Sequence, residues 1–230
     1  MTIVDELIEK YNAKYTQSIT HPLTNELCNG TLPNYKLYTY LVQDLKFFQI
    51  GLNVLGKTIA YCDNSESAIV LGKQVGFLCN DENEYFGRCL QELKDNHSDE
   101  LHAHVGKLVA DESITLDAVD RYNKFLEYLT YESTSYIELI TFVYVMEQVY
   151  LGWADYHIDN NTVAANLPYK YQEWIDLHSG PDFTRWTNFL KLEVVRCVQT
   201  PEQKQLCEKF FVKALDHEIA FFSDCYNYKE

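Results

Sequence analysis

Hydrophobic residues recur at helical spacing almost from one end of the chain to the other. In the first segment four such residues follow one another at four-residue intervals, which places them on one helical face: Ile3, Leu7, Tyr11 and Tyr15. No stretch alternates apolar and polar residues as a half-buried strand would. Only 9 glycines and 5 prolines interrupt the 230 residues. The sequence predicts an all-α protein in which residues 1–230 form one domain of roughly eight or nine helices.

Capping and turn residues predict where these helices begin and end. The clearest start is Thr200-Pro201-Glu202-Gln203, in which Thr is the cap and Gln stands at the third helical position of a capping box. That helix is expected to run close to Tyr226. Thr115 is predicted to cap a helix through Thr130. The other predicted segments are residues 33–62 with Pro33 in the first turn, two helices within 64–96 broken near 79–81, and 133–159, 168–178 and 182–198.

The net charge of the chain and its cysteine content exclude several kinds of partner and cellular location. Lys and Arg number 19 against 34 Asp and Glu, a formal charge of −15, so we expect neither a nucleic-acid partner nor an anionic membrane partner. The seven cysteines contain no CxxC pair, and the start, MTIVDELIEK, is too acidic for a signal peptide. No apolar run approaches the ~20 residues of a membrane span. These features favour a reduced, cytoplasmic protein.

Acidic residues interrupt the hydrophobic faces of three different predicted helices: Asp44, Glu147 and Glu218. On a helix the residues three and four positions away lie beside each acid, and around Asp44 these are Tyr40, Phe47 and Phe48. A buried, unpaired carboxylate costs several kcal/mol or takes up a proton. Each acid could simply bond to a neighbouring helix. With 18 tyrosines available, we favour a polar pocket inside a helical bundle.

The sequence supports other kinds of site, such as a metal centre or a phosphate-binding loop, less well, and we predict neither a metal nor a cofactor. A di-iron bundle needs Glu-x-x-His on two helices, and Asp99 with His102 is a single loose analogue. His97, His102 and His104 stand in a polar run and are predicted to lie on the surface. No phosphate-binding glycine loop, nucleophile elbow or HExxH motif is present.

Several of these residues stand in runs that resemble the TenA (thiaminase II) family. The opening His21-Pro22-Leu23, Gly30-Thr31-Leu32 and Tyr40-Leu41-Val42-Gln43-Asp44 is similar to that family's T-x-HPF, G-x-L and YL-x-QD pattern. Shorter similar pieces follow in the family's order over nearly the whole chain: Tyr122, Glu147-x-x-Tyr150-x-x-Trp153, Tyr171-x-x-Trp174-Ile175 and Glu218-x-x-Phe221-Phe222.

The resemblance implies a haem-oxygenase-like helical bundle without haem and a pocket for a 4-amino-2-methylpyrimidine. In this comparison Asp44 matches the aspartate that pairs with the amino group and a ring nitrogen, and a carboxylate suits both donors. Glu218 matches a glutamate that donates a proton to the opposite ring edge. Tyr122, Tyr150 and Tyr171 match tyrosines that line the pocket. The resemblance also implies a homo-oligomer, a dimer or a tetramer.

Two departures from the family pattern bear on the chemistry. Met146 stands four residues before Tyr150, where the better-known branch has its nucleophilic cysteine, and Glu147 follows it. Phe47 stands where the family often has Tyr. The chain therefore resembles the cysteine-lacking E branch, as a fungal member. Members of that branch hydrolyse aminomethyl- or formylaminomethyl-pyrimidines.

Three hypotheses follow for the function. The leading one is a hydrolase in thiamin salvage, in which Asp44 anchors the ring, Glu218 supplies a proton and Glu147 orients or deprotonates water. Phe47 and the three tyrosines would then surround the ring. The alternative is a catalytically inactive relative that binds a pyrimidine or serves in regulation or assembly. The third, an iron-dependent bundle oxidase, requires metal in the purified protein.

Overall fold

The computed structural model describes residues 1–230, and its regular elements are all helical, which confirms the predicted all-α class. The longest helices are α4 (Asn34–Tyr61), α6 (Asn83–Ala110), α8 (Tyr136–Asp159) and α11 (Pro201–Asn227). The shorter elements are α1 (Ile3–Lys10), α2 (Asn12–Ile19), α3 (Pro22–Cys28), α5 (Ser65–Phe77), α7 (Asp117–Glu127), α9 (Tyr169–Leu177), α10 (Gly180–Cys197) and two π-helical segments, η1 (Leu78–Glu82) and η2 (Tyr128–Glu132). The chain therefore has more helices than predicted.

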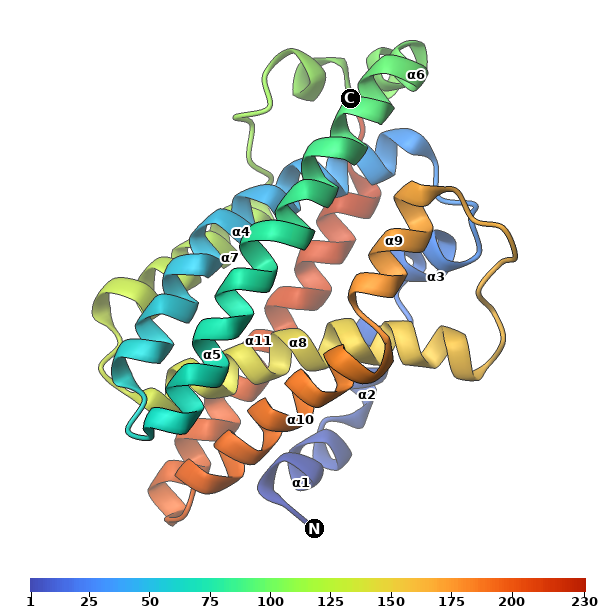
Figure 1. The fold of residues 1–230 in the computed structure, drawn as a ribbon. Coiled ribbons are helices and arrows are strands. Elements are labelled where there is room, and N and C mark those ends of the chain that lie inside the picture. The colour runs from blue at the N-terminus through green and yellow to red at the C-terminus, as the bar shows by residue number, and fades with distance from the viewer.

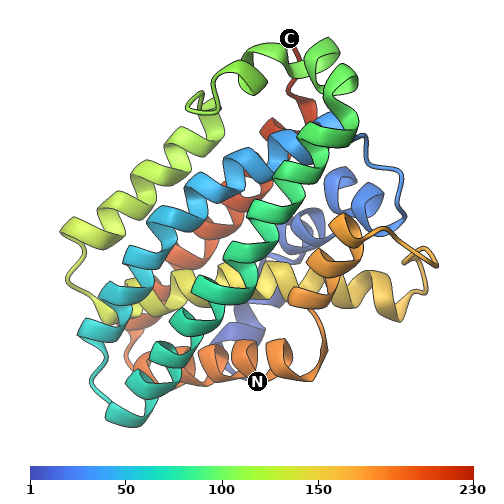
Figure 2. The ribbon, with the colours of Figure 1, turned by 45° about the horizontal axis from the view of Figure 1, so that its top comes forward.

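Helix α8 lies at the centre of the bundle. Figures 1 and 2 show it crossing α4, α6 and α11, which run in similar directions. Fifteen of its 24 residues are buried, and they lie on every side of the helix, as expected of a helix enclosed by protein. Its most extensive packing is against α11 and α10. One cluster of 57 buried hydrophobic residues surrounds it. None of the helices combines the length and hydrophobicity needed to cross a bilayer.

The predicted capping box at Thr200 is confirmed. The Thr200 hydroxyl accepts from the backbone N–H of Gln203, and the Gln203 side chain accepts from the backbone N–H of Thr200 at 2.9 Å. The predicted cap at Thr115 is wrong. The cap residue is Leu116, and the free backbone N–H of Ala118 donates instead to Asp224 of α11 at 2.7 Å. A cap supplied from another helix leaves no local sequence signal.

Four other predicted boundaries need correction. The first segment divides at Tyr11 into α1 and α2. Pro33 precedes α4 as its cap instead of lying in its first turn. The break predicted at 79–81 is the π-helical segment η1, which links α5 to α6. Helix α6 then continues to Ala110, with non-helical backbone at His97. His97 is also half-buried and hydrogen-bonds with Asn34 and Lys170, so the surface prediction is wrong for it, whereas His102 and His104 are exposed.

Gly152 allows α2 to pack closely against α8. A Cβ atom at this position would lie 2.5 Å from the Tyr15 hydroxyl and 2.7 Å from Ile19 Cγ2. The same hydroxyl accepts a hydrogen bond from Gln148 at 2.9 Å. The contact between these helices therefore depends on the missing side chain.

We predict that Gly152→Ala lowers the free energy of unfolding by about 1–3 kcal/mol, because the added methyl group overpacks the α2–α8 contact. Gly72→Ala on α5 is the matched control, since nothing lies within 4 Å of a Cβ there. The control should stabilise the protein by about 0.5–1 kcal/mol through helix propensity. Chemical denaturation measures both, and equal changes in the two variants would contradict the packing argument.

Candidate active site

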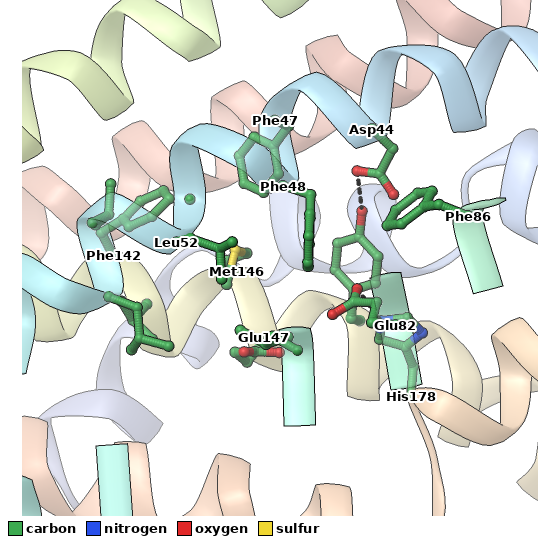
Figure 3. Close-up of a pocket in the computed structure, with 16 residues that line it drawn as sticks. Asp44, Phe47, Phe48, Leu52, Glu82, Phe86, Phe142, Met146, Glu147 and His178 are labelled. Atoms are coloured by element: carbon green, nitrogen blue, oxygen red, sulfur yellow. Dashed lines mark hydrogen bonds and ion pairs between the residues drawn. The ribbon is translucent and has the colours of Figure 1, made fainter. Parts of the chain in front are cut away.

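A pocket with about 640 Å³ of empty space, which includes the open solvent at its mouth, lies between α4, α8 and the η1–α6 junction. Eleven of the 16 residues that line it are hydrophobic. Three of the others are acids from different elements: Asp44 of α4, Glu82 of η1 and Glu147 of α8. Figure 3 shows these side chains around the same space, with His178 beside Glu82. A mostly apolar cavity with a few converging polar groups is the usual form of a small-molecule site.

A chain of hydrogen bonds ends on Asp44. The Trp174 indole N–H donates to the Tyr40 hydroxyl at 3.2 Å, and the Tyr40 and Tyr150 hydroxyls lie 3.1 Å apart. The Tyr150 hydroxyl lies 3.5 Å from Asp44 Oδ1, a long bond marked by the dashed line in Figure 3. Because an indole can only donate, Tyr40 accepts from Trp174, and Tyr150 donates to the Asp44 carboxylate, whereas either hydroxyl can be the donor between Tyr40 and Tyr150.

These hydrogen bonds nevertheless stabilise the buried negative charge of Asp44 only weakly. Only 4% of its surface is exposed, and no cation contacts it. Burial raises the pKa of Asp44 well above its ordinary value, and repulsion from Glu82 and Glu218 raises it further. The hydroxyls of Tyr40 and Tyr150 only partly oppose this rise in pKa. The side chain therefore readily takes up a proton or a ligand that donates hydrogen bonds.

Glu147 is the second buried acid, and its carboxylate forms no hydrogen bond that meets ordinary geometry. Burial raises its pKa to about 8. The Trp186 indole N–H opposes this rise, and it is itself buried without a hydrogen-bond partner. The negative charges of Glu82 and Glu218 raise the pKa of Glu147 further. A carboxyl group with a pKa near neutrality suits general acid–base chemistry.

Glu218 does not line the pocket and lies behind its aromatic wall. Its carboxylate accepts a short hydrogen bond from the Tyr122 hydroxyl. The Tyr122 ring packs against Phe47, with ring centroids 4.7 Å apart, and Phe47 faces the cavity. Burial raises the pKa of Glu218 to about 8, against the lowering effect of Tyr122. The pair therefore holds a proton close to the pocket.

The structure brings most of the predicted site residues together. Four of them line the cavity: Asp44, Phe47, Glu147 and Tyr150. Tyr122 and Glu218 form the pair behind Phe47. Tyr171 does not line the pocket, because its hydroxyl donates to the backbone carbonyl of Leu32 at 2.5 Å and ties α9 to the segment before α4.

Sequence reasoning missed Glu82 and His178. Glu82 stands in a polar run, where neighbours such as Asp81 and Glu84 are exposed as expected. His178 follows the end of α9 and had no apolar periodicity to mark it. Its Nδ1 atom lies 2.8 Å from the Trp174 carbonyl, and its Nε2 atom lies 3.7 Å from Glu82 Oε1. Only the tertiary arrangement places the two side chains in the site.

An all-helical bundle with a pocket of acids and aromatic rings between its helices is typical of a helical protein that binds a small molecule. The model of the TENA/THI-4/PQQC family matches residues 8–228, so the chain belongs to this family, which confirms the predicted relation to TenA proteins. No curated protein sequence matches the chain significantly.

Solved structures agree on the fold. A TenA homologue from P. horikoshii OT3 is similar with a TM-score of 0.79 and 19% identity, over 98% of this chain and 99% of that one. A TenA homologue from Pyrococcus furiosus has a TM-score of 0.77 and 17% identity, over 97% and 99% of the two chains. A putative TenA-like thiaminase from Sulfolobus solfataricus P2 has a TM-score of 0.70 and 16% identity, over 96% and 94%. The predicted haem-oxygenase-like fold is confirmed.

The raised pKa of Glu218 makes folding stability depend on pH. The folded protein keeps this proton up to about pH 8, whereas the unfolded chain releases it near the ordinary value of 4.5. Between these values the unfolded state binds fewer protons, so the free energy of unfolding falls as pH rises.

We predict that between pH 6.5 and 8 the wild type loses roughly 2 kcal/mol relative to Glu218→Gln, which has no proton to release. Urea denaturation at several pH values measures this difference. The exposed Glu132→Gln variant is the control and should follow the wild type. Parallel curves for wild type and Glu218→Gln would show that Glu218 ionises normally.

Proposed function

We propose that this protein hydrolyses 4-amino-2-methylpyrimidines that carry an aminomethyl or formylaminomethyl group at C5, as a cysteine-lacking, E-type member of its family in thiamin salvage. The observation that carries the proposal is the pairing of Asp44 and Glu147 in one cavity between α4 and α8. One acid can hold the ring while the other acts on the substituent. Membership of the TENA/THI-4/PQQC family supports this class of chemistry.

Asp44 is suited to hold the aminopyrimidine ring. One carboxyl oxygen can accept from the exocyclic amino group while the other shares a proton with the adjacent ring nitrogen. The raised pKa of Asp44 favours such sharing. Because the buried carboxyl holds a proton readily, that proton can lie on Asp44 or on the ring nitrogen within the same hydrogen bond. Tyr150 fixes one of the carboxyl oxygens, and Phe47 and Phe48 offer apolar faces for the ring.

We assign the water-activating role to Glu147 and a proton-donating role to Glu218. Water loses a proton to Glu147 as its oxygen bonds to the carbon that bears the nitrogen group. In the aminomethyl substrate this carbon is the methylene at C5, so the C–N bond breaks to leave a hydroxymethyl group and ammonia. In the formylaminomethyl substrate it is the formyl carbon, so the C–N bond breaks to give formate and the aminomethyl-pyrimidine. In both cases Glu147 passes the proton that it took from water to the departing nitrogen. The Glu218–Tyr122 pair holds the proton that would serve the far edge of the ring. Values of pKa near 8 allow both acids to exchange protons close to neutral pH.

A second candidate function is pyrimidine binding without turnover. Met146 lines the pocket at the position of the cysteine in the better-known branch, and a thioether cannot act as that nucleophile. None of the seven cysteines lines the cavity. Release of ammonia, formate and thiazole should be measured separately with aminomethyl-pyrimidine, its N-formyl derivative and thiamin. Tight binding without release of any product would favour this second function.

We predict that Glu147→Gln lowers the rate of product release by about 100-fold or more, because it removes the general base while keeping the shape of the side chain. Its Kd for the pyrimidine should change far less than its rate. Glu132→Gln, an exposed substitution of the same kind, is the control and should retain wild-type turnover. If Glu147→Gln also turns over at the wild-type rate, Glu147 is not the base.

A further inference from the structure

The π-helical segment η1 directs one acid of an otherwise exposed run into the pocket. Residues 79–81 and 83–84 are exposed, whereas the Glu82 side chain is only 13% exposed and lines the cavity. Leu78 and Phe86, four residues before and after it, line the same cavity. Single π-helical turns recur at functional sites because they redirect side chains within a continuous helix. Here Glu82 of the turn contributes a carboxylate to the wall of the cavity.

The partner of Glu82 leaves its carboxylate free to bind a ligand. His178 is 4% exposed and is fixed by the Trp174 carbonyl and by the ring of Tyr150, 4.8 Å away between centroids. Because a carbonyl only accepts, His178 Nδ1 carries the proton in this contact. Its Nε2 atom lies 3.7 Å from Glu82, which is too far for a hydrogen bond. Glu82 therefore has an ordered neighbour and no hydrogen bond of its own.

The pocket has a strong excess of acidic groups. Asp44, Glu82 and Glu147 line it, no lysine or arginine does, and His178 is the only basic side chain. Glu147 is 5% exposed and forms no hydrogen bond of ordinary geometry, so a buried acceptor that only the Trp186 indole approaches faces the cavity. Charges interact strongly in such a water-poor space. A cationic group entering it would gain favourable interactions that a neutral group of the same size would not.

We propose that Glu82 is the specificity residue of this pocket and selects ligands whose ring carries an ammonium group on its one-carbon substituent over neutral analogues. An ammonium has three N–H donors, which Glu82 and Glu147 can share from two walls of the cavity. His178 keeps the Glu82 side chain in place. This inference rests on the proposed function, because it places the ring at Asp44 and the substituent toward Glu82.

Two further observations agree with this assignment. The charge of Glu82 contributes to the raised pKa of both Asp44 and Glu147, so its electric field reaches the two ends of the site. Figure 3 shows the Glu82 carboxylate between these two residues. A cation at Glu82 would oppose the repulsion that Glu82 exerts on Asp44 and on Glu147.

Two pairs of probes that differ in one charge test the proposal. The first is 4-amino-5-aminomethyl-2-methylpyrimidine against its 5-hydroxymethyl analogue, and the second is benzylamine against benzyl alcohol. Stopped-flow tryptophan fluorescence gives Kd for each before turnover. The wild type and the exposed control Glu84→Gln should bind the cationic member about 10-fold or more tightly than the neutral one. Glu82→Gln should reduce this ratio about 10-fold and leave the Kd of the neutral member nearly unchanged, and Glu82→Asp should retain part of the preference.

The outcomes separate this inference from the proposed function. An unchanged ratio in Glu82→Gln, or a wild type that binds both members of each pair equally, would overturn the role of Glu82. If neither pyrimidine binds the wild type, the proposed function fails, while the benzylamine pair still decides whether Glu82 selects cations. Loss of affinity for charged and neutral members alike in both Glu82 variants would assign Glu82 to pocket structure and would also overturn the proposal.

Discussion

The burial of carboxyl groups in a hydrophobic interior, in and beside one cavity, is the constraint on which the rest of this structure depends. Asp44, Glu147 and Glu218 are each at least 95% buried, and none is paired with a cation. Burying such groups is costly unless they take up protons, and their raised pKa values reflect this cost. The large surrounding core offsets the loss of stability. Near neutral pH, Glu147 and Glu218 can therefore hold protons and exchange them in or beside the site.

The aromatic residues do more than fill this core. Trp174, Tyr40 and Tyr150 connect three helices by hydrogen bonds and fix the orientation of Asp44. Tyr122 does the same for Glu218. A tyrosine suits this role because its ring packs as a hydrophobic group while its hydroxyl bonds to an acid. These three tyrosines therefore account for how Asp44 and Glu218 are held in place.

The parts of the structure that sequence could predict are those set by neighbours along the chain. The all-α class and the Thr200 capping box follow from local spacing, and Asp44 and Glu147 stood out because residues three and four positions away are apolar. The parts set by distant contacts had no such signal. Asp224 caps α7 from α11, and Glu82 and His178 enter the pocket through a π-helical turn and a helix end.

Tyr171 is a predicted site residue that lies outside this pocket. Its motif predicted a place in the pocket wall, but its hydroxyl binds the Leu32 carbonyl instead. A short motif identifies a helix and its register, whereas the direction of a hydroxyl depends on which acceptor the tertiary structure brings within reach.

A crystal structure of the protein soaked with 4-amino-5-aminomethyl-2-methylpyrimidine in the Glu147→Gln background tests the account most directly. We expect the amino group and ring nitrogen to bind Asp44 within about 3 Å, with the ring between the α4 and α8 side chains and the ammonium group near Glu82. A ring bound elsewhere on the protein, or turned so that Asp44 contacts only its methyl group, would contradict the central claim that the buried carboxyl groups form one pyrimidine site.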